Sequence, residues 1–279
     1  EQRGHLLGLP VRSIEFLSMA EYADSPTNCA ASLDFIIPGR HDEVIGAIME
    51  HLRGHAWDLL RLNPIPGSSS TAEALARTAT REKLYFTKQV VYASAYINVG
   101  TDWQTYSSAL SSRFRKSMRS MERKLQEQGE IGYREYTLNG NADEVFDEIL
   151  AIEKRSWKWT VGVSINSVAL GDFYRVFAQE ASKKGWLRVW MMQVNGQNIA
   201  YDYIAGYHGR LASLKTSFDE HYREFSPGNL LTLREFQRFF EDGTKQISLT
   251  WGDLLTKQRW GTELEDHDEI YIFNRGFYG

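Results

Sequence analysis

The chain has 279 residues and a formal net charge of −4; 42% of its residues are hydrophobic and 13% are aromatic. This composition supports a sizeable core and excludes a disordered or collagen-like chain. The acidic balance argues against a protein whose entire surface binds nucleic acid. Cys29 is the single cysteine, so no intramolecular disulfide can form, and a reducing, cytoplasmic setting is expected. No apolar run approaches the ~18–20 residues that span a bilayer, so no transmembrane segment is expected.

The first hundred residues alternate short apolar segments with residues that break regular structure. They predict strands or buried runs at residues 32–37, 57–62 and 88–97, and helices at residues 42–52 and 71–80. Pro64, Pro66 and Gly67 are expected to end the second of these strands, because proline cannot donate to a sheet and glycine favours turns.

A basic amphipathic helix follows. Ser111 or Ser112 can cap its start, and Gly129 stands where a helix-terminating glycine is expected. Its apolar stripe consists of Phe114, Met118, Met121 and Leu125. The remaining faces, between residues 113 and 124, carry Arg113, Arg115, Lys116, Arg119, Arg123 and Lys124. Such a charged face is usually only solvated, and it is also suited to RNA, a nucleotide-linked acceptor or an anionic lipid surface.

The second half of the chain changes from a helical to a strand period. Helices are predicted at residues 143–156 and 171–184, followed by strands at 186–194, 199–207 and 211–218. Asn195-Gly196 is a strong hairpin signal and His208-Gly209 turns the chain again, so the three strands should form an antiparallel meander. The remaining segments predict a helix at 229–241, a strand at 247–251, a short helix at 253–260 and a last strand at 270–273.

The segment between this meander and the next helix has the features of an anion site. It reads Arg223-Glu-Phe-Ser-Pro-Gly228-Asn229. The first amides of a helix have no intrahelical partner, and the helix dipole adds partial positive charge to them. Gly228 allows close backbone approach, and Arg223 can bind phosphate oxygens. The structural alternative is an ordinary strand-to-helix turn with a surface arginine.

At this turn the chain resembles the GNAT superfamily of acyltransferases, whose pyrophosphate-binding turn reads Arg/Gln-x-x-Gly-x-Gly/Ala after the fourth strand. Here the turn is Arg223-x-x-Ser226-x-Gly228, with serine in place of the first glycine. The order of predicted elements over residues 108–279 is also the GNAT order. The resemblance implies an α/β chain of tandem GNAT-like fold, with a mixed, mostly antiparallel sheet flanked by helices and an incomplete first unit.

Further motifs resemble a two-domain branch related to Fem-type peptidoglycan aminoacyl-transferases, which includes bacterial proteins described as cellulose-biosynthesis acetyltransferases. The matching motifs are Ser111-x-Arg113, Glu153-x-x-Ser156-Trp157, Phe218-Asp219 and Ser226-Pro227-Gly228-Asn229. A C-terminal pattern of the branch is matched by Gly252, Asp253, Lys257, Arg259 and Trp260. Ser248, Leu249 and Thr256 depart from that pattern, and these departures leave the acceptor chemistry open.

The same resemblance divides the chain into two domains. Residues 1–106 should form a partial N-terminal GNAT-like unit, and residues 107–279 should form a C-terminal GNAT domain with the acyl-CoA site. The chain begins with Glu1, and its first unit resembles only the latter part of a GNAT unit. An earlier stretch is therefore expected to be absent from this chain.

The GNAT resemblance also implies a mechanism without a covalent enzyme intermediate, and no metal is expected. Acyl-CoA, acetyl-CoA or longer, would be the donor, and a small-molecule amine would be the acceptor. The strand before the turn should splay from its neighbour and bind the pantetheine arm, while its amides stabilise the oxyanion. The amine then attacks directly after losing its proton to a carboxylate or a water chain. The residues implied to bind the donor are Ser217, Phe218, Arg223, Ser226, Gly228 and Asn229.

Other polar and aromatic residues have both a chemical and a structural interpretation. Asp202 and Asp219 flank the expected cleft and are candidates for a general base, or else a solvated strand residue and a loop cap. The candidates for acceptor binding are Trp157, Asp253, Lys257 and Arg259. Their structural alternatives are a core aromatic, a helix cap and a solvated helix face. No His/Cys/Asp cluster has the spacing of a metal site.

Two alternative functions remain open. The first keeps the fold but takes aminoacyl-tRNA as the donor, with the basic helix at residues 113–124 holding a tRNA or nucleotide-linked ligand. The second is a catalytically degenerate GNAT-fold binding or scaffold protein in polysaccharide or cell-envelope biogenesis, which the residues Ser226, Ser248 and Thr256 favour.

Overall fold

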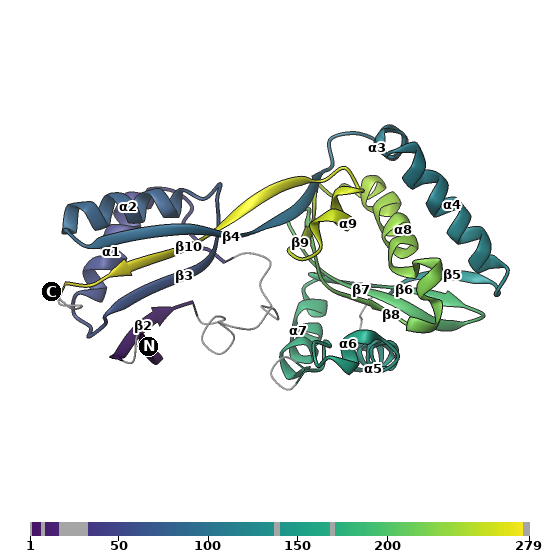
Figure 1. Ribbon diagram of the computed structural model, residues 1–279, viewed down its shortest axis with the longest axis horizontal. Coiled ribbons are helices and arrows are strands. Elements are labelled where there is room, and N and C mark those ends of the chain that lie inside the picture. Colours follow the sequence, from purple (N-terminus) through teal and green to yellow (C-terminus); the bar gives the residue numbers. More distant parts are fainter. Residues whose placement is uncertain (1, 7–8, 17–32, 137–139, 168–170, 276–279) are drawn as a thin grey trace. The chain divides into compact units, whose positions relative to one another are not determined.

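The computed structural model describes residues 2–6, 9–16, 33–136, 140–167 and 171–275; Cys29 and residue 32 lie outside these ranges. The chain forms two compact units, Glu1–Ser94 with Leu264–Gly279, and Ala95–Glu263. Strands β4 (Tyr85–Asn98) and β10 (Glu263–Phe273) each cross from one unit to the other (Figure 1). These limits differ from the division at residue 106: the first lies within β4, after Ser94, and β10 returns to the first unit. The interpretation of residues 1–106 as a partial GNAT-like unit stays a prediction.

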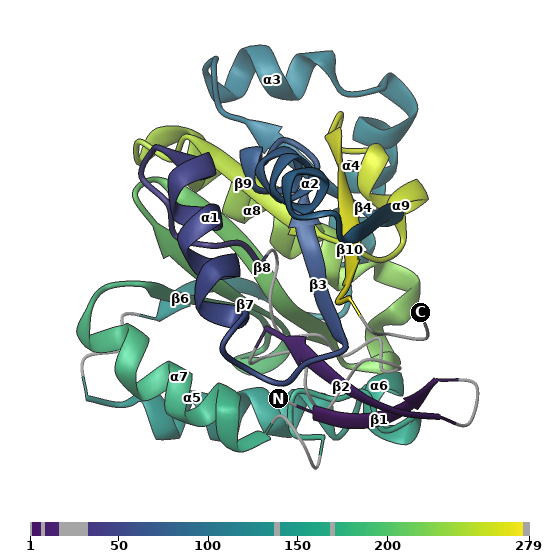
Figure 2. The same cartoon turned by 90° about the vertical axis from the view of Figure 1, so that its left-hand side faces the viewer.

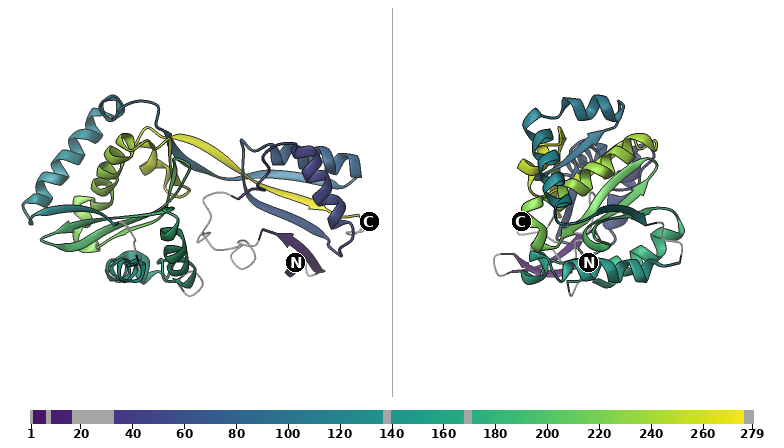
Figure 3. Two further views of the ribbon diagram at one scale, coloured as in Figure 1. Left: turned by 180° about the vertical axis from the view of Figure 1, so that it is seen from behind. Right: turned by 90° about the vertical axis from the view of Figure 1, so that its right-hand side faces the viewer.

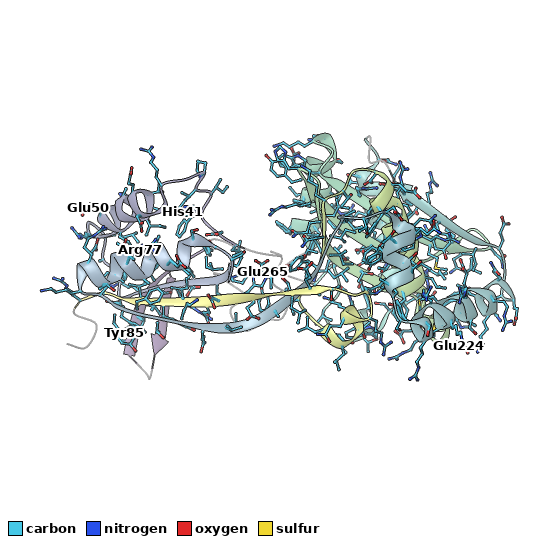
Figure 4. All side chains as sticks on the ribbon, turned by 90° about the horizontal axis from the view of Figure 1, so that it is seen from above. His41, Glu50, Arg77, Tyr85, Glu224 and Glu265 are labelled. Carbon is cyan, nitrogen blue, oxygen red and sulfur yellow. The ribbon has the colours of Figure 1, made fainter. Side chains whose placement is uncertain are left out.

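The first unit is a sheet with two helices packed on it. Its strand order is β1-β2-β3-β10-β4, and its remaining elements are β1 (Gln2–Leu6), β2 (Leu9–Glu15), β3 (Leu59–Pro66), α1 (His41–Leu52) and α2 (Ser70–Glu82). The two helices lie against the sheet (Figure 2), and the core between them includes Ile45, Met49, Leu75, Ile270 and Ile272. Arg77 of α2, which is labelled in Figure 4, pairs with Asp42 of α1 at 2.9 Å.

The structure confirms both helices predicted in this unit. The strands predicted at residues 57–62 and 88–97 are β3 and β4, which continue beyond the predicted ends. Residues 33–37 have no regular structure, so that part of the predicted strand is wrong. Pro64 does not end β3, which continues to Pro66 and ends before Gly67. Within the described residues β2 pairs only with Leu59–Arg61 of β3, so the prolines lie where one edge of the strand has no strand partner. A missing N–H costs little at such an edge.

The second unit contains a mostly antiparallel sheet in the order β5-β6-β7-β8-β9-β4. Its strands are β5 (Ile131–Tyr136), β6 (Leu187–Val194), β7 (Gln197–Tyr207), β8 (Arg210–Phe218) and β9 (Gln246–Thr250). The strands β6, β7 and β8 form the predicted meander, and Asn195 and Gly196 both have positive φ, as their tight hairpin requires. β8 and β9 run parallel. The α/β class and the mixed, mostly antiparallel sheet flanked by helices are confirmed.

Helices cover both faces of the second sheet (Figure 3). On one face lie α3 (Trp103–Ala109), α4 (Ser112–Gln126) and α8 (Pro227–Glu241); on the other lie α5 (Ala142–Glu153), α6 (Trp157–Thr160) and α7 (Gly171–Lys183). The predicted apolar stripe of α4 packs with α8 over β6 in one hydrophobic core. The capping prediction is confirmed for Ser111, whose hydroxyl accepts the amide N–H of Phe114 at 3.2 Å. The 3-10 helix η1 (Glu220–Phe225) and α9 (Leu254–Gln258) complete the unit.

Candidate functional site

Strand β8 loses one of its two neighbours halfway along its length. β9 pairs only with its first three residues, Arg210–Ala212, while β7 stays paired with it as far as Phe218. The register with β7 shifts beside Tyr203 and Ile204, so that Leu214 has no direct partner, as in a β-bulge. In the part of the chain that the structure describes, the edge of β8 beyond Ala212 therefore has no strand partner. This is the splayed strand that the GNAT resemblance implies.

The turn after β8 ends in an open helix N-terminus. Ser226 adopts the left-handed conformation, with φ 51° and ψ 53°, and Pro227 begins α8. No described side chain caps this end of α8, and the first amide with a backbone partner is that of Leu230, which donates to Ser226 O at 3.2 Å. The amides of Gly228 and Asn229 are thus available to an anion.

The turn lies directly beside the end of the splayed strand. A Cβ atom placed on Gly228 would lie 3.7 Å from Cδ1 of Phe218, the last residue of β8. Arg223 belongs to η1, whose neighbouring residue Glu224 is labelled in Figure 4. The guanidinium of Arg223 is largely exposed, and among the described residues its one ion-pair partner is Glu220, at 3.2 Å. Because exposed ion pairs are weak, this guanidinium can turn to a phosphate.

Asp202 is a buried carboxylate behind the point where β8 and β9 separate. It lies on β7, and the Ser213 hydroxyl donates to it over 2.7 Å. Glu235 of α8 is also buried beside it. Burial raises the pKa of Asp202 to about 7, and burial together with the charge of Asp202 raises the pKa of Glu235 well above its usual range. Each of the two carboxyl groups therefore keeps its proton to a higher pH than an exposed carboxyl group does.

Asp219 has a different environment. Its carboxylate pairs with Nε of Arg155 at 2.5 Å and accepts the backbone N–H of His221 at 3.0 Å, which caps η1. Arg155 also donates from Nη2 to Asn198 O at 2.8 Å. These contacts fasten the end of α5 to the ends of β7 and β8. They give Asp219 a structural role, and its action as a base stays a prediction.

Two residues outside the predicted set also lie at this strand edge. Nζ of Lys158, on α6, donates to the backbone oxygen of Thr216 in β8. Glu153 is fully buried; the Tyr201 hydroxyl donates to one of its oxygens, and its other oxygen has no partner among the described residues. Burial raises the pKa of Glu153 and lowers the pKa of Lys158. The sequence signal for both residues was the Glu153-x-x-Ser156-Trp157 motif, because Glu153 begins this motif and Lys158 directly follows it.

One donor-binding candidate, Ser217, and one acceptor-binding candidate, Trp157, differ in their burial. Ser217 is buried on β8, directly opposite Tyr201, and its hydroxyl has no partner among the described residues. Trp157 precedes Lys158 on α6 and is 47% exposed, so it is not a core aromatic.

The candidates on α9 have mainly structural contacts. The Asp253 carboxylate accepts the backbone N–H of Thr256 at 3.2 Å, so it caps α9, and hydrogen bonds from Thr256 lower its pKa. Nζ of Lys257 donates to the backbone oxygens of Leu249, Thr250 and Trp251. Arg259 is exposed at the end of α9. Lys257 is therefore not part of a solvated helix face.

The cationic side chains of α4 have no acidic partners among the described residues. Glu122 is the single acidic residue of α4, and it pairs with Arg234 of α8 at 3.0 Å. α4 packs against η1, which carries Arg223. The described residues contain no group of three or more His, Cys, Asp or Glu side chains arranged to hold a metal ion. None of the helices that the structure describes has the length and apolarity needed to cross a membrane.

The comparisons with known proteins agree with this geometry. A family model described as an acetyltransferase (GNAT) domain matches residues 112–260, more than half of the chain. The fold is similar to that of FemX, with a TM-score of 0.62 and 9% identity over 88% of this chain and 81% of FemX. It is also similar to L-PGS from Bacillus licheniformis, with a TM-score of 0.59 and 12% identity over 84% of this chain and 73% of L-PGS.

A conserved protein from Bacteroides thetaiotaomicron has a TM-score of 0.58 and 14% identity over 84% of this chain and 75% of its own. No curated protein sequence matches the chain. The matched domain includes the splayed strand, the open turn and α8. The chain therefore belongs to the GNAT acetyltransferase family and is a GNAT-type transferase with a Fem-like fold.

Proposed function

We propose that the chain transfers an acyl group from an acyl-CoA thioester to an amine by direct attack. The observation that carries this proposal is the continuity between the free edge of β8 and the open N-terminus of α8. Together they present main-chain groups that no described strand or helix pairs, ending at the amides of Gly228 and Asn229. A long ligand with an amide-bearing arm and a diphosphate fits this arrangement.

Each part of the donor would meet a different part of the site. The amides of Gly228 and Asn229 would bind the diphosphate, and Arg223 would add charge-assisted hydrogen bonds. The pantetheine arm would pair with the free edge between Lys215 and Phe218, as an added strand does. The thioester would lie near the bulge of β8, where backbone amides stabilise the developing oxyanion.

Asp202 is the residue best suited to accept the proton of the acceptor amine. Its pKa of about 7 lies near a working pH, which is favourable for general base catalysis. Ser213 donates to Asp202 and stands where the free edge of β8 begins. A proton can thus pass from the amine to the Ser213 hydroxyl while the hydroxyl proton passes to Asp202.

Isothermal titration calorimetry with acetyl-CoA tests the proposal. We expect saturable binding to the unmodified chain. Gly228→Asp should abolish binding, because a carboxylate would face the diphosphate, and Arg223→Ala should weaken it about 10-fold. Arg238→Ala, an exposed arginine near the other end of α8, is the matched control and should bind normally. No heat from any acyl-CoA would contradict the proposal and favour the scaffold alternative.

The basic helix α4 favours a second candidate donor, aminoacyl-tRNA. Its cations lack acidic partners among the described residues, and the helix packs against η1 beside the anion-binding turn. A polyanion bound there would lose affinity steeply as salt increases. Binding of tRNA with a steep salt slope that Arg119→Gln and Arg123→Gln reduce would support this donor. An RNA affinity that does not depend on α4 would exclude it.

A further inference from the structure

Lys158 occupies the edge of β8 that the proposed donor would use. It is half-buried in α6, and its Nζ donates to the backbone oxygen of Thr216. Thr216 lies beyond Ala212, in the part of β8 that β9 does not pair. The N–H of Asp219 donates to Ile199 O of β7 at 2.7 Å, and successive strand residues face alternate edges, so Thr216 faces away from β7. The ammonium therefore lies where the pantetheine arm would bind. A primary amine is thereby held on this edge, two residues from Leu214 at the bulge, near which the thioester would lie.

A comparison with Lys257 shows that Lys158 is not simply a structural lysine. Both side chains are half-buried in the second unit. Nζ of Lys257 donates to three backbone oxygens, which use all three ammonium donors. Nζ of Lys158 has one hydrogen-bond partner in the described part of the chain, the Thr216 oxygen. Two of the three N–H groups of this ammonium thus have no partner among the described residues.

The charges around Lys158 do not replace those missing partners. Glu153 and Asp202 are near enough to favour its charged form, yet neither forms an ion pair with it. Burial outweighs both carboxylates and lowers the pKa of Lys158. The neutral amine, which is the nucleophilic form, is therefore more populated here than in an exposed lysine.

We infer that Lys158 is a self-acylation site of this chain, with the acyl-CoA of the proposed function as the acyl donor. Neutral Nζ attacks the thioester carbonyl, the C–N amide bond forms and the C–S bond breaks. The leaving CoA thiolate takes up the proton that the amine loses, so that free CoA thiol and one N-acyl-lysine are the products. The inference rests on the proposed function, because it requires acyl-CoA at the edge of β8.

Acylation would also change the site in a defined way. A charged ammonium in a half-buried position becomes a neutral amide, which costs less to bury. The amide retains one N–H, so it can still donate to Thr216. The attached acyl chain would occupy the edge of β8 that the pantetheine arm needs, and the acylated chain should bind acetyl-CoA more weakly.

Peptide mass spectrometry after incubation with acetyl-CoA tests the inference. We expect one acetyl group at Lys158 within a time at which the exposed Lys154 and Lys183 are unmodified. Lys158→Arg should remove this mark, and Lys154→Arg, the matched neighbour, should leave it in place. Gly228→Asp, which cannot hold the donor, should prevent it. Acetylation that marks the exposed lysines first would be uncatalysed chemistry and would overturn the inference.

Calorimetry on the same samples separates this inference from the proposed function. If the chain binds acetyl-CoA but Lys158 stays unmodified at saturation, self-acylation is refuted and the donor site stands. If acetyl-CoA does not bind, the proposed function fails and self-acylation fails with it. Should Lys158→Arg fold poorly, Lys158→Gln, which resembles the acylated state, provides a second variant without the nucleophile.

Discussion

The hydroxyl of Ser213 donates a hydrogen bond to the buried carboxylate of Asp202, 2.7 Å away, where β8 separates from β9. Ser213 thus connects a group that titrates near neutral pH to the edge of the strand on which acyl transfer is proposed. The backbone oxygen of Ser213 is bonded separately by the Thr250 hydroxyl, at 3.3 Å. The position of Ser213 is therefore fixed on both sides, and its hydroxyl is aimed at Asp202.

This relationship predicts the pH dependence of acyl transfer. The rate of CoA thiol release from acetyl-CoA, with a supplied primary amine, should rise with pH through about 7, because only ionised Asp202 accepts a proton. Asp202→Asn should lower the rate about 100-fold or more and remove this step. Ser213→Ala should lower the rate while leaving acetyl-CoA affinity unchanged. A pH profile that Asp202→Asn does not alter would exclude this base.

The same buried pair should make stability depend on pH. The folded-state pKa values of Asp202 and Glu235 lie above their ordinary values, so their contribution to stability is complete below about pH 4 and is lost as pH rises through about 7. Glu235→Gln should therefore reduce the loss of unfolding free energy between pH 5 and 8, by on the order of 1–4 kcal/mol. Urea denaturation at both pH values measures this difference.

The control for that experiment is Asp253→Asn. Asp253 is exposed and hydrogen bonds from Thr256 lower its pKa, so it titrates below the window from pH 5 to 8. Its removal should leave the slope of unfolding free energy against pH unchanged in that window. An equal change of slope in both variants would show that the buried pair is not responsible.

The sequence predicted the elements of the second unit well where local patterns dominate. The meander followed from the change of period at Trp186 and the Asn195-Gly196 turn, and both are confirmed. Strand β5 and helix α3 were missed, because short elements with few apolar residues have weak periodicity. The role of Gly129 was also misread. α4 ends at Gln126, and Gly129 is required because a Cβ there would lie 2.2 Å from the side chain of Asn195.

The sequence identified the main-chain part of the candidate site and the carboxylate of Asp202 on the meander, but it missed the side chains that other elements contribute. The turn at Gly228 is a local motif, so its open amides could be expected from sequence alone. Glu153, Lys158 and Glu235 gain their properties from burial beside β7 and β8. Burial of this kind depends on tertiary packing, and no spacing in the sequence encodes it.

A third prediction separates the two aspartates first considered as bases. Asp219→Asn should lower the unfolding free energy by about 1–3 kcal/mol, because it leaves the Arg155 guanidinium without its charged partner. The pH profile of acyl transfer should keep its step near 7. A double-mutant cycle with Arg155→Met should give a favourable coupling energy. A profile that loses its step in Asp219→Asn would transfer the role of base to this residue.

The last prediction concerns the attachment of α9 to the sheet. Lys257→Met should lower the unfolding free energy by about 1–3 kcal/mol, because three backbone oxygens around β9 lose a donor that reaches all of them. Arg259→Met, two residues further on and exposed, should change stability by less than about 0.5 kcal/mol. Thermal and urea denaturation of both variants measure the difference. Equal stability of the two variants would mean that Lys257 does not hold this segment, and its half-buried amine would then be available to a ligand.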